Sequence, residues 1–129
     1  MGAGLPPQAQ CALKRWLPDS ELQCVRVQTD GPICWLCGRF HRSAVTLGRS
    51  IHFVKGHYQP DTPYGLGLIA HELVHVGQYR RYGFVGFLVR YLWQLLRARL
   101  RYGEHLPLEQ PGYALQRQVE AALRQERGL

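Results

Sequence analysis

Residues 68–79 read LIAHELVHVGQY and contain the motif H-E-x-x-H within a run of apolar side chains. On an α-helix, residues four apart lie on the same face, so His71 and His75 would direct two imidazoles at one point, as zinc-binding pairs do. Glu72 lies about 100° round the helix from His71, where a general base can reach a metal-bound water. The apolar neighbours indicate a buried helix that holds these side chains rigidly.

The alternative for each histidine is a hydrogen-bonded core residue, which is the commoner role of a buried imidazole. Two histidines and a glutamate on one apolar helix are harder to explain in that way, because each buried polar group needs a partner of its own. We therefore interpret His71, Glu72 and His75 as parts of a metal site.

A catalytic zinc usually takes three protein ligands and keeps its fourth position for water. The metzincin form of the motif requires glycine at position 78 and histidine at position 81, where this chain has Gln78 and Arg81. The third ligand is therefore expected to be a glutamate from a later segment. The downstream candidates are Glu104, Glu109, Glu120 and Glu126.

Glu109 is the best of these candidates, because it stands at the start of the last amphipathic segment, where backbone contacts can fix its position. Its alternative role is a solvated carboxylate in the first turn that favours the helix dipole. Glu120 has Arg117 and Arg124 nearby on the same expected helix, so an ion pair is its expected role.

The chain also reads SIHFVKGHY at 50–58 and TPYGL at 62–66, ahead of HELVHVGQY at 71–79. These stretches resemble a family of small bacterial zinc metallopeptidases of the extracellular contractile injection system core-domain type, named mostly as a domain of unknown function. The similarity runs from about residue 22 to residue 119. It implies a zincin-like fold, His71 and His75 as zinc ligands, Glu72 as catalytic base and a downstream glutamate as third ligand. It also implies that the strand before the metal helix offers an edge to an extended peptide.

One segment departs from the family pattern. The family's third ligand often lies in Pro-x-Glu-x-x-Ala, whereas here Gly112 stands at the alanine position and Pro111 precedes it. The departure concerns the segment around Glu109 and leaves the helix motif unaffected.

The 129 residues fit one domain, with residues 1–20 as an N-terminal extension and a core at about 22–127. Alternating and β-branched residues predict strands at 24–29, 44–48 and 51–54, the last two forming a hairpin. A short helix is expected at 8–17, stopped by Pro18, and Asp19 and Ser20 are expected to cap a brief turn. Thr62 followed by Pro63 predicts the start of the metal helix, and Gly83 its end. With further helices at 84–101 and 113–127, we expect an α+β, zincin-like minimal domain: a small antiparallel sheet, the HExxH helix and two more helices.

Four cysteines are present, and two of them form Cys34-x-x-Cys37. Such a pair can bind zinc, form a redox couple or serve as two small apolar residues. Because Cys11 and Cys24 do not supply a second C-x-x-C, we favour buried or redox-silent thiols.

The segment 84–101 is apolar but interrupted by arginine, and its apolar run is too short to span a bilayer. It could lie on an anionic membrane surface, or it could be a core helix with a basic rim. We favour the core helix, because a small domain needs this apolar area to fold. The net charge of +7 permits nucleic-acid association, but no nucleic-acid-binding motif accompanies the charge.

The expected function is zinc-dependent hydrolysis of a peptide or protein substrate, with Zn²⁺ on His71, His75 and Glu109 and with Glu72 as general base. The expected donors to the oxyanion are Tyr102, His105 and Tyr113, with no ranking among them. Gln78 shares a helix face with the two histidines and is a candidate hydrogen-bond partner for them.

The alternative is a catalytically silent, zinc-stabilised binding or assembly module associated with secretion machinery or with a membrane surface. The first residues lack the features of a secretory signal, so the expected location is the cytoplasm, with non-classical export left open.

Overall fold

The computed structural model describes residues 3–40 and 42–129. This part of the chain contains six helices and a three-stranded sheet, so the expected α+β class is confirmed. The helices are α1 (Pro7–Leu13), α2 (Asp19–Cys24), α3 (Pro32–Arg39), α4 (Pro63–Tyr82), α5 (Phe84–Arg97) and α6 (Gln110–Glu126). The strands are β1 (Arg26–Gln28), β2 (Ala44–Leu47) and β3 (Ser50–Phe53).

The sheet has the order β1-β3-β2, with the expected hairpin between β2 and β3. The expectation of an antiparallel sheet is wrong for its other half, because β1 pairs parallel to β3 with Val27 opposite Ile51. A parallel pair needs a crossover connection, and here the crossover includes α3, a helix that the sequence analysis did not predict. β2 is left as an edge strand, whereas β3, the strand directly before α4, is central; the expectation that the strand before the metal helix offers an edge is therefore wrong for β3.

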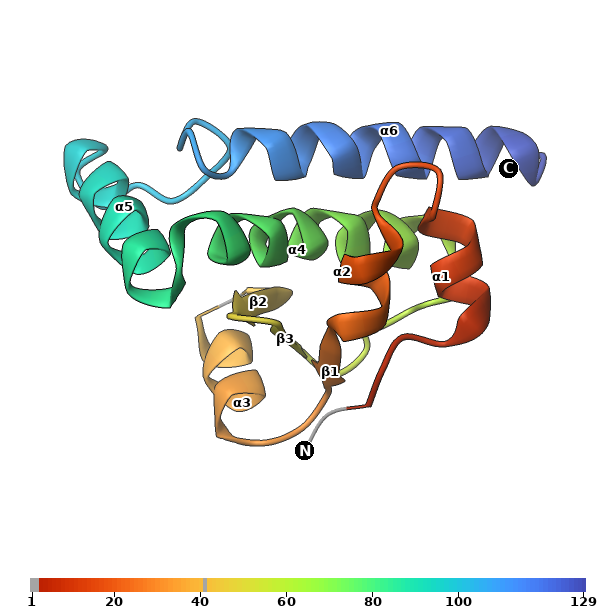
Figure 1. Ribbon diagram of the computed structural model, residues 1–129, viewed down its shortest axis with the longest axis horizontal. Helices are drawn as coiled ribbons and strands as arrows, with labels where there is room; N and C mark the ends of the chain where they lie inside the picture. Colours follow the sequence, from red (N-terminus) through yellow and green to blue (C-terminus); the bar gives the residue numbers. More distant parts are fainter. Residues whose placement is uncertain (1–2, 41) are drawn as a thin grey trace.

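The metal helix α4 begins and ends where its sequence predicts. The Thr62 side chain accepts a hydrogen bond from the backbone N–H of Gly65 at 3.0 Å, and Pro63 opens the helix. Gly83 ends it with φ of +76°, a conformation that favours glycine. In Figure 1, α4 lies between the sheet and α6, so the side chains of its central turns are buried on both sides.

The first residues contribute to the main core, although the sequence analysis treated 1–20 as an extension. Leu5, Ala9, Leu13 and Leu17 are buried against side chains of α4 and the sheet. Their burial explains why α1 forms despite its length of seven residues, since short helices depend on tertiary packing.

α5 is not the core helix that we favoured from the sequence. Only Phe87 of this helix is buried, together with Tyr79 and Leu108 in a small separate cluster. Figure 1 shows why: α5 turns away from the end of α4 and projects from the body of the molecule. The helix ends at Arg97, because Arg99 and Leu100 have positive φ values of 56° and 63°. No helix in the described residues is long and apolar enough to cross a membrane.

Candidate metal centre

The structure brings His71 and His75 of α4 together with Glu109, the residue that precedes α6. The Nε2 atoms of the two imidazoles lie 3.0 Å and 2.9 Å from the same carboxylate oxygen, Oε1 of Glu109. All three side chains are buried. Glu109 is fixed by its own backbone, because its N–H donates to the carbonyl of Leu106 at 2.8 Å. These three residues could hold a metal ion.

Glu120 takes the role expected from its neighbours. Its carboxylate forms an ion pair with Arg124 at 2.9 Å, one helical turn further along α6. Glu104 pairs with Arg117, and Glu126 pairs with Arg15 at 2.6 Å. Of the four downstream glutamates, Glu109 is therefore the one that joins the two histidines.

Two glutamines determine which nitrogen of each imidazole carries a proton. The side-chain amide of Gln78 donates to the carbonyl of Leu108 at 3.0 Å, so its oxygen faces Nδ1 of His75 at 2.9 Å. The amide oxygen of Gln116 lies 2.9 Å from Nδ1 of His71. An amide oxygen only accepts hydrogen bonds, so each Nδ1 must be the donor. Each neutral imidazole then directs the lone pair of Nε2 at Glu109.

If both imidazoles are neutral, two nitrogen lone pairs and a negatively charged carboxylate face one another. Such a cluster is stable only with a positively charged group, a proton or a metal ion, between them. Protons can meet this need: burial alone would lower the pKa of His75, but its contact with Glu109 raises that pKa above the ordinary value. Burial alone would likewise raise the pKa of Glu109, but hydrogen bonds with the two histidines and Tyr91 lower it. A metal ion meets the same need with one charge centre, and outer hydrogen bonds of this kind commonly orient metal-binding histidines.

Gly112 explains how α6 approaches so closely. A Cβ atom at this position would lie 3.0 Å from Cδ2 and 3.1 Å from Nε2 of His71, closer than side chains normally pack. Gly112, which departs from the alanine of the family pattern, therefore allows this close packing. An alanine here would displace either the imidazole or the start of α6.

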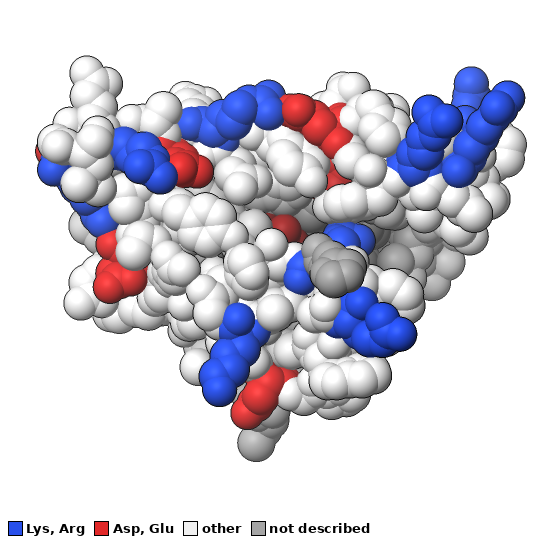
Figure 2. Space-filling model, turned by 180° about the vertical axis from the view of Figure 1, so that it is seen from behind, with Lys and Arg blue, Asp and Glu red and all other residues white. Residues whose placement is uncertain are grey.

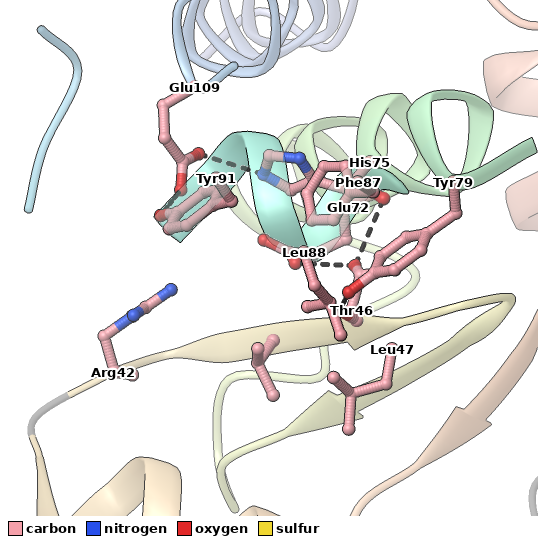
Figure 3. A pocket seen from close by; sticks show the side chains of 11 residues that line it. Arg42, Thr46, Leu47, Glu72, His75, Tyr79, Phe87, Leu88, Tyr91 and Glu109 are labelled. Atoms are coloured by element: carbon pink, nitrogen blue, oxygen red, sulfur yellow. Dashed lines mark hydrogen bonds and ion pairs between the residues drawn. The ribbon is translucent and has the colours of Figure 1, made fainter. Parts of the chain in front are cut away.

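Glu72 lies beside the three clustered residues without joining them. The hydroxyl of Thr46 on β2 donates to its Oε1 at 2.8 Å, while its Oε2 is 4.0 Å from Nε2 of His71. Figure 3 shows this carboxylate turned toward the cavity between α5 and β2. Thr46 is itself anchored, because the hydroxyl of Tyr79 donates to its carbonyl at 3.1 Å.

Two cavities meet at Glu72. One, of about 210 Å³, lies between β2 and α5, and the other, of about 250 Å³, lies beside His71 and the start of α6. Arg42 lines both. Figure 2 shows a hollow in this face of the molecule, with a carboxylate in its depth and basic side chains beside it.

The candidate oxyanion donors separate into two groups. Tyr102 and Tyr113 line the cavity beside His71, and their hydroxyls lie 3.4 Å apart. The ring of Tyr113 packs edge-on against His71 with 4.4 Å between centroids. His105 lies elsewhere, since it is exposed and its Nε2 contacts the carbonyl of Arg101 at 2.7 Å.

Sequence reasoning missed four residues of this site: Thr46, Gln116, Arg42 and Tyr91, whose hydroxyl donates to Oε2 of Glu109 at 2.5 Å. Thr46 carried a weak signal as a polar residue on the inward face of an apolar strand. Gln116 lies seven residues, about two helical turns, after Glu109, the residue that precedes α6, so the two lie on the same side of the helix. Arg42 carried no signal, because only the tertiary fold brings its guanidinium to the cavities.

Cys34 and Cys37 lie away from the centre. Both are buried on α3, and burial raises the pKa of each thiol. Cys11 and Cys24 are exposed, and all four are free thiols. The burial of Cys34 and Cys37 agrees with their interpretation as buried thiols, whereas the exposure of Cys11 and Cys24 does not.

A family model described as the eCIS core domain matches residues 4–83. The match includes α1, the sheet and the whole of α4, and it ends before α5, Glu109 and α6. The two histidines and Glu72 are thus within the matched part, whereas the third side chain of the cluster comes from beyond it. No curated protein and no solved structure matches the chain.

Proposed function

The chain belongs to the eCIS core domain family, and we propose that it is a zinc-dependent metallopeptidase that hydrolyses peptide bonds. The observation that carries the proposal is the convergence of two Nε2 atoms and one carboxylate beside a second, separately held carboxylate. His71, His75 and Glu109 would be the zinc ligands, and Glu72 the general base.

The donor set suits zinc. Two imidazole nitrogens and one carboxylate oxygen are a usual protein contribution to a catalytic zinc site, which keeps one further position open. Zinc in such a site supplies a Lewis acid that polarises a carbonyl group and lowers the pKa of water. The residues fit this group because an amide oxygen faces each Nδ1, so Nε2 is the nitrogen of each imidazole that faces Glu109 and is left for a metal ion.

Glu72 is held in a way that suits proton transfer. The hydrogen bond from Thr46 engages Oε1 and fixes the carboxylate, while Oε2 remains directed at the cavity. A carboxylate so placed can accept a proton from the attacking water and deliver it to the leaving amine. Thr46 thus has a positioning role through Glu72.

The edge strand β2 suits an extended substrate. Among the described residues no strand pairs with its outer edge, and extended peptides commonly bind by adding a strand to such an edge. The cavity between β2 and α5 is lined by Val45, Leu47, Phe87 and Leu88. We infer that it accepts an apolar side chain next to the scissile bond.

Arg42 and the tyrosines are the candidate groups for the developing oxyanion. Arg42 lines both cavities, and its guanidinium lies 3.9 Å from the ring centroid of Tyr102. A guanidinium or a tyrosine hydroxyl at this place can donate to a negatively charged oxygen. His105 is not proposed for this role, because of its position.

A metal-stabilised binding or assembly module is the second candidate. One observation favours it: Glu109 and Gln116 join α6 to α4 through the two histidines. A metal ion bound there would brace this helix pair whether or not a peptide is cleaved.

Glu72→Gln distinguishes the two candidates, because it keeps the shape of the side chain and removes the base. We expect the variant to keep its zinc and its fold and to lose roughly 10²–10⁴-fold in cleavage of a broad peptide library. Zinc content and circular dichroism of both proteins serve as controls. Equal cleavage by the two proteins, or no cleavage by the zinc-loaded wild type, would overturn the peptidase proposal.

A further inference from the structure

α5 presents an apolar surface to solvent. We call it the apolar face of α5, and its residues are Val85, Leu88, Val89, Leu92, Trp93 and Leu96. Their spacing of three and four residues places them along one side of the helix. Phe87 and Tyr91 lie on the other side and pack toward α4 and Glu109.

An apolar strip of this size marks an interaction surface. Proteins rarely leave large contiguous apolar patches in water, and those that remain usually meet a partner or a membrane. Leu92 and Trp93 are 55% and 61% exposed, so their side chains contribute little to the folded core. The partner must therefore offer an apolar surface of its own.

The charge around this face limits the partner further. Between residues 80 and 101 the sequence has six arginines and no acidic residue. Within the described part of the chain, none of these arginines forms an ion pair with a carboxylate. Arg90 and Arg97 lie beside the apolar face along α5, and Arg99 and Arg101 follow its end.

We propose that α5 lies on an anionic lipid surface, with its apolar face in the acyl boundary and its arginines at the phosphate groups. Helices with a broad apolar face containing tryptophan and leucine, bordered by arginine, bind membranes in this way. α5 has 14 residues and lies on the surface without spanning it. A second copy of the chain fits less well, because pairing two apolar faces would bring unpaired arginines together.

This orientation places the cavity between β2 and α5 at the membrane. Leu88 belongs to the apolar face and also lines the cavity beside Glu72. Binding through α5 would therefore place the mouth of this cavity close to the lipid surface. The inference rests on exposure and charge alone and does not require zinc or peptidase activity.

Co-sedimentation of the full chain with lipid vesicles tests the proposal. We expect binding to phosphatidylcholine vesicles that contain phosphatidylserine, a loss of binding at high salt, and little binding to phosphatidylcholine alone. Arg97→Gln should weaken binding about fivefold. Replacing Leu92 and Trp93 with glutamine should weaken it about tenfold or more.

The matched control is an exposed tryptophan and leucine that are adjacent in the sequence on another helix. Trp35 and Leu36 on α3 are 68% and 48% exposed, and their replacement with glutamine should leave binding unchanged. The proposal would be overturned if the α3 and α5 double substitutions weakened vesicle binding equally, or if the wild-type chain stayed in the supernatant. A different result in light scattering would be a wild-type dimer that does not bind vesicles. If replacing Leu92 and Trp93 with glutamine dissociates that dimer, the proposal is overturned in favour of a second copy of the chain.

Discussion

At the scale of single residues, the site depends on hydrogen bonds that fix proton positions. Gln78 orients His75 from within α4, and Gln116 orients His71 from α6. Because both amide oxygens accept from Nδ1, the Nε2 atoms are available as ligands. The hydroxyl of Thr46 orients Glu72 in the same way, by donating a hydrogen bond to its carboxylate.

Gln116→Leu should weaken zinc binding by roughly 10–100-fold, the usual loss when the partner of a metal-binding histidine is removed. The leucine keeps the bulk of the side chain but cannot accept from His71. Titration with a competing zinc indicator measures the affinity. Gln118→Leu, at an exposed position on the same helix, is the matched control and should bind as the wild type does; equal affinities in all three proteins would refute the role of Gln116.

The residues of the site differ in how far the sequence could predict them. His71, Glu72 and His75 share one helix, so their mutual placement follows from helical geometry. Glu109 could be preferred over Glu120 because arginines flank the latter. Tertiary packing alone brings four further residues to the site: Thr46, Gln116, Arg42 and Tyr91. Their spacing in the sequence therefore could not indicate that they belong to it.

At the scale of elements, the pair α4 and α6 holds the centre together. Glycines permit the close approach at two points: Gly112 faces His71, and a Cβ at Gly67 would lie 3.0 Å from the carbonyl oxygen of Gln116. The bounds of α4 could be predicted because Thr62, Pro63 and Gly83 act locally. The mixed sheet and the exposure of α5 could not, because they depend on the crossover through α3 and on the direction in which the chain leaves α4.

Gly112→Ala should displace the start of α6 from His71 and weaken zinc binding, because its Cβ would lie 3.0 Å from the imidazole. Gly86→Ala is the matched control on α5, where the nearest atom would be at an ordinary 3.5 Å. We expect the control to keep zinc and to stabilise the helix by up to about 1 kcal/mol. Zinc affinity and thermal unfolding of the two variants measure the contrast; unchanged zinc affinity in Gly112→Ala would contradict the tight packing.

At the scale of the whole molecule, the candidate site combines residues from the part of the chain that the family model matches with residues from beyond it. The part that matches the eCIS core domain supplies α4 and the sheet. The later part supplies Glu109, Gln116 and the α5 side chains that line the cavity between β2 and α5. The centre is therefore complete only when α6 is packed on α4, and a metal ion bound there would couple the two parts.

The most direct measurement of the central claim is the metal content of the full chain, purified without chelator, beside Glu109→Gln and Glu120→Gln. We predict about one zinc ion per chain in the wild type and in Glu120→Gln, and a large loss in Glu109→Gln. Circular dichroism shows whether each variant remains folded. A wild type without metal, or a folded Glu109→Gln that keeps its zinc while Glu120→Gln loses it, would contradict the account.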